Sequence, residues 1–149
     1  MAQEKNPPSK LTKWFCYTVI IGLIPIILRM FASWIIEGVN NFSAADFIAF
    51  GFVLHISIIN ELEHITGDDN WKSVGNIFSI GGIVLCSGLM FALLVVESGY
   101  NKINVEALTN SSMALAICSF IICWIIFYRL NKKAVVTAPT SANKSGATA

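Results

Sequence analysis

The stretch HISIINELEHITGDDNWK, from His55 to Lys72, decides how the chain is organised. Long apolar segments lie on both sides of it, and it holds the densest group of ionisable residues away from the two ends of the chain. A polar stretch between two apolar segments is typical of a turn between helices. We therefore expect this stretch to join the second and third helices of the chain.

Residues within this stretch also indicate where the two helices end and begin. The preceding helix should continue through Glu61 and His64, and Gly67 is a suitable C-terminal stop because glycine tolerates the left-handed conformation. Asp68 or Asp69 is a suitable N-cap for the next helix, since a carboxylate there faces the positive end of the helix dipole. These signals predict a short turn.

The composition of the chain argues against a water-soluble domain. Its 149 residues are 55% hydrophobic and only 13% charged, whereas soluble domains carry about 25% charged residues. A surface with so few charges is poorly solvated by water, so we expect an integral membrane protein of one domain. The net charge of +1 does not provide the clustered basic face that nucleic-acid binding requires, so no nucleic-acid partner is expected.

Four apolar stretches are long enough to cross a bilayer as helices. A hydrocarbon core of about 30 Å needs about 20 helical residues, and the stretches cover residues 14–36, 44–65, 71–96 and 107–129. We therefore expect an all-α integral membrane protein whose residues 14–130 form four transmembrane helices in a compact bundle. Residues 1–13 are polar, and the apolar run after them is too long for a cleavable signal peptide. Residues 131–149 should form a disordered cytoplasmic tail.

The positions of lysine and arginine predict the orientation in the membrane. Cytoplasmic segments are enriched in these residues. The loop after the first span has none, and the loop after the third span has only Lys102. We expect both ends of the chain and residues 61–72 to lie in the cytoplasm, most naturally at a bacterial inner (plasma) membrane. The basic residues of the two ends are Lys5, Lys10, Lys13, Arg129, Lys132, Lys133 and Lys144.

Small residues on the third span indicate how it packs. Membrane helices associate through small residues because lipid provides no hydrophobic driving force between them. One helix face carries four small residues, and a second stripe follows Gly81, Gly88 and Ala92. We expect the first face to pack against another helix, and the two stripes together predict that the third helix is central. The first face consists of Gly75, Ser79, Gly82 and Cys86.

Arg29 is the most costly residue to place in a membrane. An arginine near the centre of a spanning helix costs about 2.5–3.5 kcal/mol on insertion scales. Two interpretations remain open: Arg29 extends its charge to the interface, or it forms an intramembrane cluster with Asp46 and Glu97, near the outer ends of the second and third spans. In the second case a role in fixing helix packing is favoured over a transport site.

Patterns that would indicate catalysis are weak or missing. Glu61 and His64 have the Glu-x-x-His spacing of carboxylate-bridged metal sites, but those sites need the motif twice. We interpret His55 as a neutral histidine that is hydrogen-bonded to a neighbouring helix, and a proton-sensitive element is the alternative interpretation. The sequence contains no HExxH, no GxSxG and no phosphate-binding loop. We therefore predict no enzymatic activity, no metal and no cofactor.

The functional hypothesis is a small non-enzymatic membrane protein that acts as a sensor, an immunity protein or a subunit of a complex. In architecture alone the chain resembles small four-span bacterial proteins, such as immunity proteins for pore-forming toxins and membrane subunits of anti-phage defence systems. The expected partners are the lipid bilayer, further copies of the chain and a cytoplasmic protein. An oligomeric channel or transporter is the alternative. The candidate docking patch is Glu61, Glu63, His64, Asp68 and Asp69.

Overall fold

Five helical segments make up the part of the chain that the computed structural model describes, which is residues 13–64, 69–100 and 102–136. The first segment is a π-helix that continues directly into the next, so the chain forms four long helices. All four are long and apolar enough to cross a membrane, and they pack together, which confirms the all-α prediction. The segments are η1 (Phe15–Ile20), α2 (Ile21–Ile35), α3 (Ala44–Glu63), α4 (Asp69–Glu97) and α5 (Val105–Val136).

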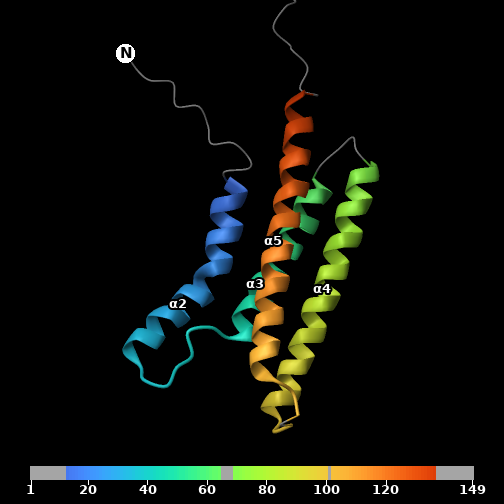
Figure 1. Ribbon diagram of the computed structural model, residues 1–149. Coiled ribbons are helices and arrows are strands. Elements are labelled where there is room, and N and C mark those ends of the chain that lie inside the picture. The colour runs from blue at the N-terminus through green and yellow to red at the C-terminus, as the bar shows by residue number, and fades with distance from the viewer. Residues whose placement is uncertain (1–12, 65–68, 101, 137–149) are drawn as a thin grey trace, which may run out of the picture.

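The helices α3, α4 and α5 run side by side, while the first helix begins beside them and then bends away (Figure 1). The start of η1, the end of α3 and the far end of α5 lie at one end of the molecule, which we call the terminal end. The connections after α2 and after α4 lie at the opposite end, which we call the loop end. This arrangement places the end of α3 and the start of α4 at the same end of the molecule as the start of η1 and the far end of α5.

Helix boundaries differ in places from those that the sequence indicates. The helix α3 ends at Glu63 and α4 begins at Asp69, close to the predicted hairpin. The helix α5 continues to Val136, so residues 131–136, predicted as part of a disordered tail, are helical. Lysine and alanine in this part of the sequence favour helix, which accounts for the extension. Other predicted features fall outside the described residues, namely residues 1–12, Gly67, Asp68 and residues 137–149.

The helix α3 is the centre of the bundle. It contacts η1, α2, α4 and α5, and 44% of the residues in its apolar stretch are buried, against 17% in α4. The prediction that the third span, α4, is central was therefore wrong. A helix surrounded by other helices is screened from lipid, which explains why the central helix is also the least apolar of the four. Its fully buried side chains include Ile48, Leu54, Ile58 and Leu62.

The helix α4 packs on α3 through its small residues. The residues that α4 buries are Gly75, Ser79, Gly82 and Cys86. A Cβ atom on Gly75 would lie 2.8 Å from the Leu62 side chain, and one on Gly82 would lie 2.1 Å from Nε2 of His55. The large side chains of α3 thus occupy space that only glycine leaves open on α4.

The two glycines of the second small stripe of α4 face open space, whereas its third member, Ala92, is partly buried against the cluster that contains Ile48 and Leu108. Nothing lies within 4 Å of a Cβ atom placed on Gly81 or Gly88. Gly88 instead lines an apolar groove of about 390 Å³ on the outside of α4 and α5, together with Val84, Leu85, Leu89 and Leu115. The second stripe is therefore not a continuous packed face, because Gly81 and Gly88 have open space beside them while Ala92 packs.

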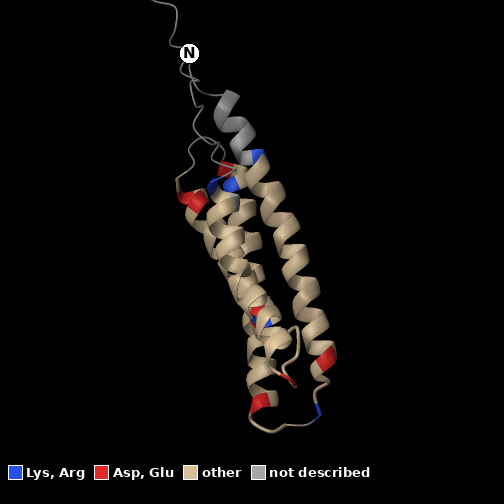
Figure 2. Cartoon of the chain, turned by 90° about the vertical axis from the view of Figure 1, so that its left-hand side faces the viewer, with Lys and Arg blue, Asp and Glu red and all other residues tan. Residues whose placement is uncertain are grey.

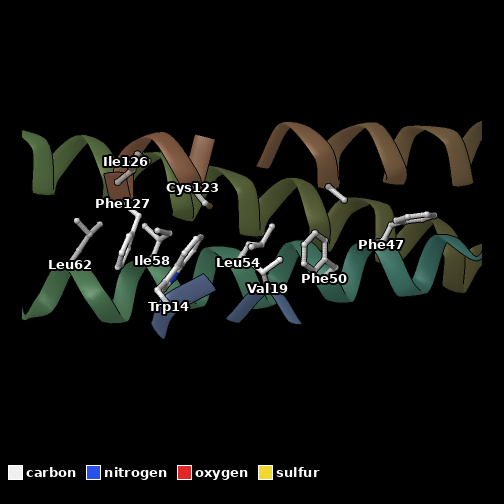
Figure 3. Packing of buried hydrophobic residues seen from close by; sticks show 11 residues of the cluster. Trp14, Val19, Phe47, Phe50, Leu54, Ile58, Leu62, Cys123, Ile126 and Phe127 are labelled. Atoms are coloured by element: carbon white, nitrogen blue, oxygen red, sulfur yellow. The ribbon is translucent and has the colours of Figure 1, made fainter. Parts of the chain in front are cut away.

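The first helix is fixed at the terminal end by Trp14. Its buried ring stacks on Phe127 of α5, with the ring centroids 4.7 Å apart. The indole Nε1 donates a hydrogen bond of 2.9 Å to the Ser57 hydroxyl on α3, and the Thr18 hydroxyl lies 2.8 Å from the same oxygen. Figure 3 shows Trp14 lying against the side chains of α3 and α5 in the apolar core. This end of the first helix is therefore part of the core.

We predict that Gly82→Ala destabilises the bundle by about 1–3 kcal/mol, the usual penalty of overpacking a core. The new methyl group would collide with the His55 ring, which is itself held between helices. The measurement is unfolding of the purified protein in mixed detergent and dodecyl sulfate micelles, followed by helical circular dichroism.

Gly81→Ala is the matched control, because it changes the neighbouring residue and meets open space. It should leave the free energy of unfolding unchanged or raise it by up to about 1 kcal/mol, since alanine is the better helix former. Equal effects of the two substitutions would contradict the packing of Gly82 against His55.

Candidate functional site

A buried histidine joins the three core helices. His55 of α3 is 1% exposed. Its Nε2 atom lies 2.9 Å from the Ser119 hydroxyl of α5, and its Nδ1 atom lies 4.0 Å from the Cys123 sulfur one helical turn further along. The backbone of Gly82 on α4 leaves room for the ring. The imidazole therefore contacts both α4 and α5.

These contacts satisfy a neutral imidazole. A neutral ring has one nitrogen that donates and one that accepts, and it has one hydroxyl and one thiol as partners. No group of three or more His, Cys, Asp and Glu side chains gathers to hold a metal in the residues that the structure describes. The geometry fits an interhelical hydrogen bond, which in membrane proteins contributes about 0.6 kcal/mol on average.

An ion pair joins α2 to α3 near the loop end. The Nε atom of Arg29 donates a hydrogen bond to Oδ2 of Asp46, which lies in the first turn of α3. The Arg29 side chain is 34% exposed and that of Asp46 is 13% exposed. The structure thus brings two of the three residues of the predicted charge cluster together. Glu97 lies exposed at the end of α4 and forms no ion pair with any described residue.

The ion pair lowers the cost of placing a charge within an apolar helix. An arginine that faces lipid without a partner is expensive, and a carboxylate beside it offsets much of that cost. Asp46 is also well placed in the first turn of α3, where the helix dipole favours a negative charge. The pair therefore allows α2 to carry a charge within an apolar span. It has no further charged partner within the described residues.

Charged side chains also gather at the terminal end, as Figure 2 shows. Glu63, His64 and Asp69 are exposed and Glu61 is half-buried. None of the four forms an ion pair with a residue in the described ranges. Asp68, the fifth residue of the predicted patch, lies outside those ranges. The acidic side chains are therefore displayed on the ends of two packed helices without being used to hold them together.

Basic side chains occupy the same end of the bundle. Arg129 of α5 lies over the ring of Trp71 in the first turns of α4, with the guanidinium carbon 4.9 Å from the ring centroid. This cation–π contact holds α4 and α5 together where the helices leave the apolar region. Arg129 itself remains exposed, as does Lys13 before η1. The terminal end thus presents acidic groups of α3 and α4 beside basic groups of α4 and α5, since Lys72 lies three residues after Asp69.

Sequence reasoning did not find the partners of His55 or of Trp14. Ser119 and Cys123 are four residues apart and so share a face of α5, which is a signal that the sequence contains. Nothing in the sequence says that this face meets His55. No family model, curated protein or solved structure matches the chain.

We predict that Arg29→Leu lowers the free energy of unfolding by about 1–2 kcal/mol. Removing one partner of a buried ion pair costs about 3–5 kcal/mol, and the loss is smaller here because the Arg29 side chain is partly exposed. The measurement is thermal or dodecyl sulfate unfolding in detergent.

Glu97→Gln is the control and should leave stability unchanged, because Glu97 pairs with no described residue. The double substitution Arg29→Leu with Asp46→Leu should recover most of the loss, since no unpaired charge remains. A neutral or stabilising effect of Arg29→Leu alone would instead mean that the Arg29 charge is satisfied at the membrane interface.

Proposed function

We propose that the chain is a non-enzymatic integral membrane protein that binds a cytoplasmic partner through its terminal end. In this proposal both termini lie in the cytoplasm of a bacterial cell, and the protein serves as a sensor, an immunity protein or a subunit of a complex. The observation that carries the proposal is the set of acidic side chains at the end of α3 and the start of α4. They are displayed there without an ion pair to any described residue.

The rest of the bundle supports a binding role over a catalytic one. The interior between α3, α4 and α5 is filled by large apolar side chains of α3 set against small residues of α4. The buried His55 has partners on α5 and is enclosed. By contrast, Glu63 and Asp69 are accessible and form no ion pair with a described residue. Accessible charges on rigid helix ends suit recognition of another molecule.

The chemistry of the patch defines the partner. Carboxylates of Glu61, Glu63 and Asp69 attract lysine and arginine, so the partner should present a basic surface or segment. Arginine is the better match, because its planar guanidinium can bind a carboxylate through two hydrogen bonds. Interactions between exposed charges are screened by salt over a Debye length of about 8 Å at physiological ionic strength, so binding should weaken as salt rises.

The orientation can be tested separately from binding. We expect a green fluorescent protein fused after the last residue to fluoresce in bacterial cells, and an alkaline phosphatase fused there to be inactive, because the former needs the cytoplasm and the latter the periplasm. Fusions placed after Gly38, between α2 and α3, should show the reverse pattern. Active phosphatase at the C-terminus would place the acidic patch outside the cytoplasm and would refute the proposal.

Binding is tested by replacing charges while keeping side-chain size. A photo-crosslinking amino acid is placed at position 73, an exposed site near the start of α4, and the crosslink between this protein and its partner is measured in cells. We expect Glu61→Gln, Glu63→Gln and Asp69→Asn together to lower the yield of that crosslink by at least roughly tenfold. A tenfold change corresponds to about 1.4 kcal/mol of binding free energy. A variant with Glu97→Gln and Glu106→Gln is the matched control, since it removes acidic charge from the loop end only. A crosslink of equal yield in all three proteins would exclude the acidic patch as the docking surface.

A further inference from the structure

The first helix is divided by Pro25 into two parts that are held very differently. We propose that the part beyond Pro25, residues 27–35, is a hinged arm and that the Arg29–Asp46 ion pair is the latch that keeps it against α3. The proposal depends on the chain lying in a membrane. It does not depend on the cytoplasmic partner, so either idea can fail without the other.

The part before Pro25 is anchored by several contacts. Trp14 stacks on Phe127 and bonds to Ser57, and Thr18 bonds to the same hydroxyl. Gly22 of the same helix is buried against α3, and a Cβ atom on it would lie 2.8 Å from the Phe50 ring. These contacts join the first half of the helix to the core.

The part beyond Pro25 has little that holds it. No residue from 23 to 35 is buried, and Trp34 and Ile35 are 81% and 82% exposed. Figure 1 shows this part of α2 bending away from α3, α4 and α5. Within the described residues, the polar contact between residues 27–35 and the rest of the bundle is the bond from Arg29 to Asp46.

The backbone on both sides of the arm can accommodate movement. Proline lacks the N–H group that would bond to the carbonyl four residues earlier, and its ring crowds that carbonyl, so Pro25 weakens the helix where the arm begins. The connection after the arm contains Gly38, with a φ of 87° and open space around it. Because glycine adopts both signs of φ, this connection can change shape without moving α3.

A membrane makes an ion pair an effective latch. In water, apolar surface on the arm would drive it against the bundle, but in lipid that surface is solvated equally well in either position. The position of the arm is then decided by where the Arg29 charge finds a partner. In the closed state the partner is Asp46. In the open state the flexible Arg29 side chain can reach lipid phosphate groups at the loop-end interface.

Distances between spin labels test the arm directly. One label replaces Trp34 near the end of the arm and the other replaces Leu94 at the loop end of α4; both positions are exposed. A control pair replaces Tyr17 and Tyr128 at the terminal end, also exposed. The exposed Cys16 and Cys118 are changed to serine, while Cys86 and Cys123 stay because they are buried. The protein is reconstituted in vesicles of phosphatidylcholine and phosphatidylglycerol, and distances are measured by pulsed electron paramagnetic resonance.

We expect a single narrow distance for both pairs in the parent protein. In Asp46→Asn and in Arg29→Gln, the Trp34–Leu94 distance should broaden and shift by roughly 5 Å or more, about one helical turn. The Tyr17–Tyr128 distance should not change. The charge-reversed double variant Arg29→Asp with Asp46→Arg should restore the narrow distance, because it restores the pair.

Three results would overturn the proposal. An unchanged Trp34–Leu94 distance in both single variants would show that the ion pair does not hold the arm. Broadening of both label pairs together would show that the whole bundle loosens. Failure of both single variants to fold would show that the pair is required by the core, since a latch that acts on the arm alone leaves α3, α4 and α5 packed.

Discussion

The close approach of α4 to α3 is the constraint on which the rest of the bundle depends. It is possible because Gly82 has no side chain where the His55 ring lies, and because Gly75 has none where Leu62 lies. Each of these glycines makes room for a large α3 side chain, so the contact sets the register of α4 along α3. His55 then extends the same constraint to α5 through Ser119 and Cys123. One ring thereby fixes the relative positions of three helices.

The first helix follows a different physical rule. In lipid, helices stay together through close packing and polar contacts, because burying apolar surface against another helix gains little over leaving it in lipid. The core helices satisfy this rule with large side chains set against small ones. The part of α2 beyond Pro25 has no buried residue and depends on the bond between Arg29 and Asp46. The bundle therefore has a tightly packed core and one helix whose far half is attached by a charge.

The periodicity of apolar and small residues along the sequence predicts some features of this packing but not others. Four helices follow from the lengths of the apolar stretches, and the buried face of α4 follows from the spacing of Gly75, Ser79, Gly82 and Cys86. Periodicity shows that a face can be approached closely but not which helix approaches it, so Gly81 and Gly88 suggested close packing that the structure shows at neither residue. For the same reason the sequence placed α4 at the centre instead of α3. The large residues of α3 looked like ordinary lipid-facing residues.

The candidate sites show the same limit. Arg29 was recognisable from the free-energy cost of placing an arginine in a membrane span, but Asp46 and Glu97 were equally plausible partners for it. Which carboxylate Arg29 reaches depends on how α2 bends at Pro25 and on the π-helix before it. That π-helix left no signal in the hydrophobic pattern. The acidic residues at the terminal end could be located from the sequence because they interrupt two apolar stretches. The identity of the proposed partner does not follow from them, since a surface charge specifies the sign of what it could bind but not its shape.

In α3 the residues that pack against other helices are separate from the charged residues near its end. In α3, the residues that face other helices include Leu54, His55 and Ile58, while Glu63 and His64 lie beyond the packed region and are exposed. Substitutions of Glu63 or His64 therefore break no ion pair within the described residues, whereas Trp14 and Arg129 at the same end do hold helices together. In the stretch from His55 to Lys72, His55 and Ile58 therefore pack between helices, whereas Glu63, His64 and Asp69 are exposed at the end of the bundle.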